Sequence, residues 1–423
     1  MQNPDILPPR VALYDRIEAE YIAGLEAQGV HFASACTDEA AKAAAIVSLQ
    51  ERGARVRNGG ASISVNNLSS ACVACTGDRG SKTFLLSLLC DRQCYFCFNP
   101  NQLNYAEQRC GLSNWQAELD EYSALNAPVS HIALTGGEPL VHAEETVSFF
   151  ETVRARYPAA HTRLYTTGDR LDTVLLEALA KAELTEIRFS VKIDDPPDAL
   201  AQTLRHIVLA RDYIPQVMVE MPAIPGTGQE MRSLLDTLDG LGIYGINLLE
   251  FCFPRHNWPE FESRGFRVKN PPFPVLYEYG YAGGLPIAGS EELSLELLSY
   301  ALDQGMRMGL HYCSLENKHC DEVYQLNVPY ATAFASYLLD PEDFFLKTVV
   351  AFGEDAQRLE LELLRTGVPY ERDPEDDAVQ FNPQYFERFL DLDLRMYCSY
   401  NVVAMRDGEA VLRELKLTEL LKD

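Results

Sequence analysis

Short runs of β-branched and aliphatic residues recur through the middle of the chain, and each run is followed by a stretch with helical spacing of apolar positions. Four of the predicted strands end near Thr167, Lys192, Met221 and Glu250. The intervals between these ends are 25, 29 and 29 residues. Barrels of alternating strands and helices use roughly 30 residues per unit, so the spacing predicts an α/β fold with a parallel βα barrel or part of one.

Alternation within the strand that ends near Lys192 assigns its two faces. Ile187, Phe189, Val191 and Ile193 share the side that should meet the helices. The opposite side carries Arg188, Ser190, Lys192 and Asp194, which would then point into the barrel. A polar row in an interior needs a partner, and this pattern favours a bound polar ligand over a structural ladder of ion pairs.

The flanks of the barrel have different patterns. Alanine- and glutamate-rich helical stretches at 10–27 and 37–52 predict an N-terminal helical extension over residues 1–78. The barrel is predicted over 79–325, with extra strands near its end, one of them at 306–313. A strand, a helix and a hairpin turn at Asp407-Gly408 predict a small α+β accessory domain over 326–423. Peptide binding by strand addition and a simple lid or packing role both remain open for that domain.

Composition limits the setting and the partners. The 423 residues are 47% hydrophobic, enough to bury a large core. Eleven cysteines without an N-terminal apolar signal predict a cytoplasmic protein whose thiols stay reduced. The sequence contains no run of about 18 apolar residues, so no membrane span is predicted. The net charge of −26 makes a nucleic-acid substrate unlikely, because such a surface repels phosphates.

Two motifs carry chemistry. Cys90, Cys94 and Cys97 follow the apolar run 83–89 in a Cys-x3-Cys-x2-Cys spacing. Three thiolates can hold three corners of a four-iron cluster, which leaves one iron open to an outside molecule. The second motif, Gly136-Gly137-Glu138-Pro139, follows the predicted strand 131–135 and offers a carboxylate beside two glycines that let a ligand approach the backbone.

The cysteine spacing, with Phe96 directly before Cys97, and the Gly-Gly-Glu-Pro segment together resemble the radical S-adenosylmethionine (radical SAM) superfamily over about residues 80–255. The resemblance implies a partial (β/α)6 TIM-like barrel, with a 4Fe-4S cluster on the three cysteines and S-adenosylmethionine chelated to the open iron. It implies further contacts to the cofactor from these residues: Tyr95, Phe96, Gly136, Gly137, Glu138, Pro139, Thr167, Ser190, Lys192 and Glu220.

The resemblance also implies an enzyme. A reductant such as flavodoxin or ferredoxin would supply an electron, S-adenosylmethionine would be cleaved, and the 5′-deoxyadenosyl radical would abstract hydrogen from a substrate. A peptide or protein substrate is favoured, followed by a small metabolite and by activation of a glycyl-radical enzyme. The non-enzymatic alternative is an iron–sulfur or zinc scaffold protein.

A further group of thiols is predicted to approach the same end of the barrel. It consists of Cys72, Cys75, Cys313 and Cys320. Both a second metal site, as an iron–sulfur cluster or structural zinc, and buried unligated thiols remain open for this group.

Overall fold

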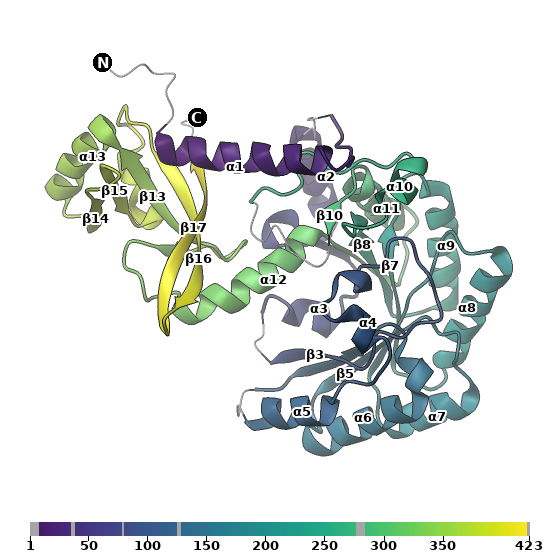
Figure 1. Cartoon of the computed structure of the whole chain (residues 1–423). Helices are drawn as coiled ribbons and strands as arrows, with labels where there is room; N and C mark the ends of the chain where they lie inside the picture. The colour runs from purple at the N-terminus through teal and green to yellow at the C-terminus, as the bar shows by residue number, and fades with distance from the viewer. Residues whose placement is uncertain (1–7, 35–38, 78–79, 125–127, 276–283, 421–423) are drawn as a thin grey trace. The chain divides into compact units, whose positions relative to one another are not determined.

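The computed structural model describes residues 8–34, 39–77, 80–124, 128–275 and 284–420, which form two compact units (Figure 1). The large unit comprises Phe32–Pro272 and Gly280–Asn317. The small unit comprises Met1–His31, Phe273–Tyr279 and Lys318–Asp423. None of the helices in the described ranges combines the length and the apolar composition that a membrane crossing requires.

A nine-stranded sheet forms the large unit, in the order β1-β2-β11-β8-β7-β6-β5-β4-β3. The consecutive strands from β3 to β8 run parallel, and β11 adds a seventh parallel strand beside β8. The parallel strands are β3 (Ser81–Leu85), β4 (His131–Thr135), β5 (His161–Thr166), β6 (Glu186–Phe189), β7 (Gln216–Ala223), β8 (Gly245–Glu250) and β11 (Gly309–Cys313). β2 (Ser62–Val65) pairs antiparallel with β11, and β1 (Arg55–Arg57) pairs antiparallel with β2. Because β1 and β3 end this order without pairing to each other, the described sheet is a partial barrel of the predicted kind rather than a closed one.

Helices follow the strands as the periodicity predicts. They are α5 (Trp115–Ala124), α6 (Ala143–Arg156), α7 (Thr173–Lys181), α8 (Pro197–Ala210), α9 (Gly228–Leu241) and α11 (Ser290–Asp303). In α9 the apolar residues Met231, Leu234, Leu235 and Leu238 form one buried stripe. The helix ends where Gly242 takes a left-handed conformation (φ 64°), which a residue with a side chain adopts only at a cost.

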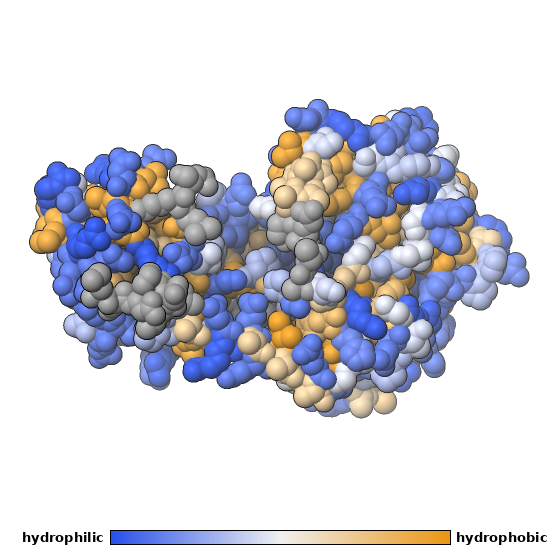
Figure 2. All heavy atoms as spheres, turned by 90° about the horizontal axis from the view of Figure 1, so that it is seen from above, coloured by the Kyte–Doolittle hydropathy of each residue, from blue (hydrophilic) through white to orange (hydrophobic). Residues whose placement is uncertain are grey.

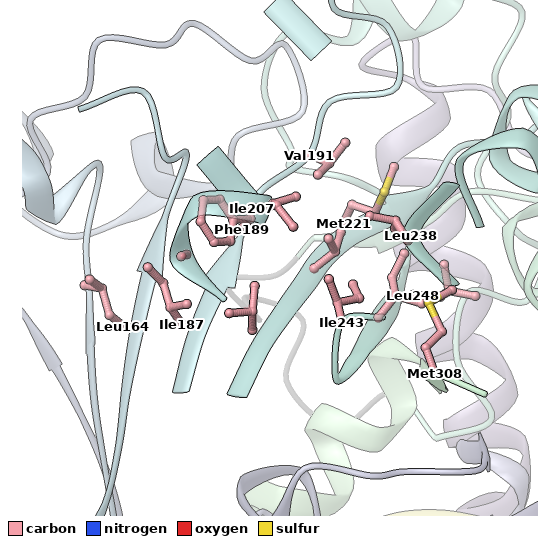
Figure 3. Close-up of a cluster of buried hydrophobic side chains, with 14 of the residues drawn as sticks. Leu164, Ile187, Phe189, Val191, Ile207, Met221, Leu238, Ile243, Leu248 and Met308 are labelled. Carbon is pink, nitrogen blue, oxygen red and sulfur yellow. The ribbon is translucent and has the colours of Figure 1, made fainter. Parts of the chain in front are cut away.

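The main core lies between the sheet and these helices. Alternate strand residues such as Leu164, Ile187, Phe189 and Leu248 are fully buried there, with Ile207 of α8 and Leu238 of α9 against them (Figure 3). The face assignment of the strand that contains Ile187 is therefore correct. The strand is shorter than predicted, because its ladder ends at Phe189 and not at Lys192.

Shorter elements connect the main ones. They are α2 (Glu39–Glu51), η1 (Asn58–Gly60), α3 (Ser70–Ala74), η2 (Asn99–Asn101), α4 (Tyr105–Gln108), η3 (Pro139–His142), β9 (Cys252–Phe253), α10 (Trp258–Ser263) and β10 (Leu285–Pro286). β9, which follows β8, pairs antiparallel with β10.

The small unit contains an antiparallel sheet in the order β14-β15-β13-β16-β17, with β12 (Leu338–Leu339) paired to β13. Its strands are β13 (Leu346–Phe352), β14 (Tyr370–Asp373), β15 (Ala378–Phe381), β16 (Tyr397–Arg406) and β17 (Glu409–Glu419). Its helices are α1 (Pro9–Glu26), α13 (Gly353–Thr366), η4 (Val328–Tyr330), η5 (Pro383–Phe389) and most of α12 (Leu315–Asn327). Asp407 and Gly408 both have positive φ, 52° and 85°, as the predicted hairpin turn requires.

Both faces of β13 are covered, which explains why α1 belongs to the small unit. Val349 and Ala351 pack with α13, whereas Val350 packs with Val11 of α1. Arg10 of α1 also forms an ion pair with Glu414 of β17 at 2.6 Å. The predicted boundaries 1–78, 79–325 and 326–423 therefore differ from the observed division, which separates α1 from α2 and assigns residues from 318 onward to the small unit.

Hydrophilic side chains dominate the visible face of each unit, and the apolar residues there occur in separate groups (Figure 2). This distribution is consistent with a chain of net charge −26.

Candidate functional site

The three motif cysteines lie on the loop between β3 and η2, at the carboxyl end of the parallel strands. Cys90, Cys94 and Cys97 are all partly exposed. The loop turns back on itself, because the Cys97 amide donates to the Cys94 carbonyl at 3.1 Å. The Arg92 amide donates to the Cys90 sulfur at 3.4 Å.

The three thiols lie within range of one another's charges. Burial raises the pKa of Cys90, and the negative charges of Glu138, Cys94 and Cys97 raise it further. Burial likewise raises the pKa of Cys97, with a further contribution from Cys94. Thiolates at such a place need a cation, and the irons of a cluster would supply it.

The donor set fits a 4Fe-4S cluster held by Cys90, Cys94 and Cys97. Among the described residues, no three histidine, cysteine or carboxylate side chains converge on a point that suits one metal ion. A cluster does not require such convergence, because each cysteine binds a different iron of the cubane.

Gly136 and Gly137 place the second motif against the cysteine loop. The Gly137 amide donates to the Ser87 carbonyl and the Glu138 amide to the Leu89 carbonyl, both at 2.8 Å. A Cβ on Gly136 would lie 2.2 Å from the Ser87 oxygen, and one on Gly137 would lie 2.3 Å from the Leu89 oxygen. The two glycines therefore permit close contact between two backbone segments, a requirement that the sequence did not reveal.

Glu138 is only 3% exposed, and its carboxylate is occupied within the protein. It accepts hydrogen bonds from the Leu140 amide at 3.0 Å, the Thr166 hydroxyl at 2.8 Å and the Thr167 amide at 2.6 Å. These bonds join the end of β4 to the end of β5. The neighbouring Pro139 is buried at the start of η3.

Aromatic rings cover the loop between Cys94 and Cys97. The Tyr95 and Phe96 ring centroids are 5.0 Å apart, and Phe251 at the end of β8 lies 6.2 Å from Tyr95 and 5.8 Å from Phe96. The Arg264 guanidinium lies 4.2 Å from the Tyr95 centroid. Burial raises the pKa of Tyr95 to about 12, so its hydroxyl stays protonated.

Ser190 and Lys192 follow directly after β6. The Ser190 amide donates to the Thr166 carbonyl at 2.8 Å. The Lys192 ammonium lies 5.7 Å from the Phe96 ring centroid, and its charge partly offsets the rise in the pKa of Cys97. The structure thus brings Lys192, Phe96 and the cysteine loop together.

Arg92, between two of the cysteines, was missed by sequence reasoning. Its guanidinium donates to Asp169 at 2.6 and 2.7 Å and to Asp195 at 2.7 Å. This ion pair lowers the pKa of Asp169, chiefly through its hydrogen bonds with Arg92. Beside it, Arg170 pairs with Asp91 at 2.7 Å. The loop is therefore tied to the segments that follow β5 and β6, and the only sequence signal was acidic residues placed just after two predicted strands.

Comparison with known proteins finds a family match over part of the chain. Residues 85–238 match the model of the Radical SAM superfamily. The chain contains a radical SAM domain. This match includes the whole cysteine loop, the Gly-Gly-Glu-Pro segment and the ends of β4 to β7. Proteins of this family use a 4Fe-4S cluster and S-adenosylmethionine.

Among curated proteins, the chain is 28% identical over 245 residues to the putative glycyl-radical enzyme activating enzyme MJ0021 of Methanocaldococcus jannaschii, covering 55% of this chain and 60% of that protein. It is 29% identical over 110 residues to the PqqA peptide cyclase of Granulibacter bethesdensis, covering 26% and 28% of the two chains. Among solved structures, Streptococcus suis SuiB bound to the precursor peptide SuiA matches with a TM-score of 0.42 and 12% identity, over 58% of this chain and 51% of that one. The chain thus spans less than two thirds of each relative.

Inside the radical SAM domain, Arg188 is engaged by ion pairs and not left for a ligand. It is 2% exposed and pairs with Glu186 and Glu220, both at 2.5 Å. The Glu220 carboxylate also accepts from Asn247 at 2.8 Å. The preference for a bound ligand as the partner of Arg188 was therefore wrong. Its own strand β6 and the neighbouring strand β7 supply the counter-charges, and sequence alternation alone does not show which side chains meet.

Cys72 of α3 is the third partner of Arg188, whose guanidinium lies 3.3 Å from the Cys72 sulfur. Burial by itself raises the pKa of this thiol, but the charge of Arg188 and a hydrogen bond with His311 lower it to about 6. Cys72 therefore acts as an anionic member of the interior network near neutral pH.

The remaining members of the predicted second thiol group have other surroundings. The Cys75 thiol donates to the Ala71 carbonyl at 3.4 Å, and the Cys313 sulfur accepts from the Asn317 amide at 3.2 Å. Cys320 belongs to the small unit, where it is buried in an apolar cluster with Val323 and Phe344. The large unit does not assemble the predicted four-thiol site.

Proposed function

We propose that this protein is a radical SAM enzyme that cleaves S-adenosylmethionine reductively and abstracts hydrogen from a substrate. The observation that carries the proposal is the cysteine loop, which holds three thiols within eight residues and packs against the Gly-Gly backbone at the carboxyl end of the strands. Cys90, Cys94 and Cys97 would hold a 4Fe-4S cluster, which would supply the one-electron reduction of S-adenosylmethionine that, with a hydrogen atom from the substrate, leaves methionine and 5′-deoxyadenosine. The electron would come from a flavodoxin or ferredoxin.

The residues around the loop have roles that follow from their contacts. The ion pairs of Arg92 hold the loop in position, and Glu138 fixes the end of β4 against the end of β5. Tyr95, Phe96 and Phe251 form an apolar wall that would exclude water and border the adenine ring. Lys192 places a positive charge beside this wall, where the carboxylate of S-adenosylmethionine would be attracted. Thr167 and Ser190 lie at the adjoining strand ends, whereas the pairing of Glu220 with Arg188 argues for an interior structural role.

A polypeptide is the favoured substrate. The two curated relatives described above are named for an activating enzyme of a glycyl-radical enzyme and for a peptide cyclase, so both names refer to polypeptide substrates. Activation of a glycyl-radical enzyme is therefore the specific second candidate.

The test is anaerobic reconstitution with iron and sulfide, addition of dithionite and S-adenosylmethionine, and measurement of 5′-deoxyadenosine. The wild-type protein should carry about four irons and form the product, and Ala at Cys90, Cys94 or Cys97 should abolish both. Ala at the exposed Cys110 is the matched control, and it should behave as wild type. Product formation at the wild-type rate by the Cys94→Ala variant would contradict the proposal, and a protein that binds iron but never consumes S-adenosylmethionine would be a scaffold.

A further inference from the structure

Arg163 is a buried cation without a contacting anion. It lies in the middle of β5 and is 7% exposed, and its Nε atom is buried without a hydrogen-bond partner. Within the described ranges, its guanidinium makes no hydrogen bond and no ion pair. A buried N–H donor without an acceptor is costly, so such a guanidinium is expected to have a partner that comes from outside the chain.

The side chain points into the barrel. Leu164, the next residue, is fully buried in the core that faces the helices (Figure 3), so Arg163 and Tyr165 lie on the opposite side of β5. The positive charge of Arg163 accordingly lowers the pKa of Cys72 and of Glu220. The Arg163 guanidinium stacks on the Tyr165 ring, 5.1 Å from its centroid.

Tyr165 presents a second unused donor at the same place. Among the described residues, its hydroxyl has no hydrogen-bond partner, and burial raises its pKa far above the usual range, so it keeps its proton. The guanidinium of Arg188 also lies over this ring, 5.6 Å from the centroid. Arg188 already binds both nearby carboxylates, Glu186 and Glu220. Arg163 and Tyr165 therefore form a donor pair that no anion of the described chain contacts.

We propose that Arg163 and Tyr165 bind a carboxylate group of the substrate inside the barrel, a proposal that rests on the proposed function. A planar guanidinium offers two parallel N–H groups to a carboxylate, and the tyrosine hydroxyl adds a third donor. A phosphate fits less well, because its larger negative charge would lie close to Glu186 and Glu220. The stacking places the donors near Tyr165, two residues or about 7 Å before Thr167 at the strand end. The carboxylate would thus be anchored below the cofactor, with the reacting part of the substrate extending toward the cysteine loop.

The first test compares two arginines that differ in pairing. Thermal unfolding is followed by tryptophan fluorescence for the wild type, Arg163→Met and the matched control Arg188→Met. Arg163→Met should melt at or above the wild-type temperature, because it removes an unpaired buried charge, whereas Arg188→Met should melt lower, because Glu186 and Glu220 lose their partner. An equal loss in both variants would make Arg163 a structural counter-charge and overturn the proposal.

The second test uses N-acetylglycine, which carries a carboxylate, against N-acetylglycinamide, which does not, at constant ionic strength. N-acetylglycine at about ten times its Kd should raise the Tm of the wild type by roughly 3 °C, and it should leave the Tm of the Arg163→Met variant unchanged. An equal shift with the amide, or in Arg163→Met, would refute a carboxylate site. Glycine serves as a further arm: a shift with glycine as well as N-acetylglycine indicates a free amino acid, and a shift with N-acetylglycine alone indicates a peptide end.

The cofactor and the proposed function are separated by their own measurements. Saturating S-adenosylmethionine on the reconstituted wild type should leave the N-acetylglycine shift intact, and loss of the shift would assign Arg163 to the cofactor's carboxylate and overturn the proposal. Iron content and 5′-deoxyadenosine report on the proposed function alone. A Tm shift with N-acetylglycine but no 5′-deoxyadenosine would contradict the proposed function and support the carboxylate site. Formation of 5′-deoxyadenosine without a Tm shift would support the proposed function and contradict the carboxylate site.

Discussion

Replacing Glu138 by Gln should destabilise the large unit even when no cofactor is present. The carboxylate accepts three hydrogen bonds and is 3% exposed. Gln keeps one acceptor oxygen, but its NH2 group would face either the Thr167 amide or the two donors at Oε1. At least one buried N–H then loses its acceptor. A hydrogen bond to a charged group contributes roughly 1.5–3 kcal/mol, and an unsatisfied buried donor adds a desolvation cost, so the expected loss is about 3 kcal/mol.

Tryptophan fluorescence is suited to this measurement, because the chain has two tryptophans and both Trp115 and Trp258 belong to the large unit. For a unit of this size, a loss of about 3 kcal/mol corresponds to a fall in Tm of roughly 6 °C. The matched control is Glu151→Gln on the exposed face of α6, which should change stability by less than about 0.5 kcal/mol.

Two results would refute this reasoning about Glu138. An unchanged Tm in the cofactor-free Glu138→Gln protein would mean that the three hydrogen bonds do not hold the strand ends together. An unchanged Tm combined with a loss of S-adenosylmethionine binding would show that Glu138 binds the cofactor directly, as the sequence alone predicts.

Three further predictions concern groups outside that contact. Burial and the neighbouring Glu291 raise the pKa of Glu250 to about 7, so the folded state binds a proton more tightly than the unfolded state and stability should fall as pH rises from about 4.5 to 7. Glu250→Gln should therefore raise the Tm more at pH 8 than at pH 5, and equal gains at both would disprove the shift. Arg92→Met should speed loss of iron to a chelator by roughly 5- to 30-fold, as expected for about 1–2 kcal/mol of partly exposed ion pairs, while the exposed Arg109→Met should not. Cys72→Ala should keep the full iron content of about four and bind no zinc, and a loss of iron in this variant alone would restore a second metal site.

The sequence by itself determined the repeating part of the fold and the chemistry of the cysteine loop. Period-2 and period-3.6 patterns are local, so the parallel strands, the helices between them and the buried face of Ile187 and Phe189 were all predictable. The spacing of Cys90, Cys94 and Cys97 is local too. It indicated the cofactors before any fold was known.

Tertiary structure decided which polar groups meet. Arg188 joins Glu186 on its own strand, Glu220 on the next strand and Cys72 on a preceding helix, and no local pattern encodes such long-range pairing. The assignment of α1 to the small unit depends in the same way on residues about 400 positions apart. The same distinction separates Arg188 from Arg163. Both are inward-facing arginines on neighbouring strands, but only the folded chain shows that one has its counter-charges and the other does not.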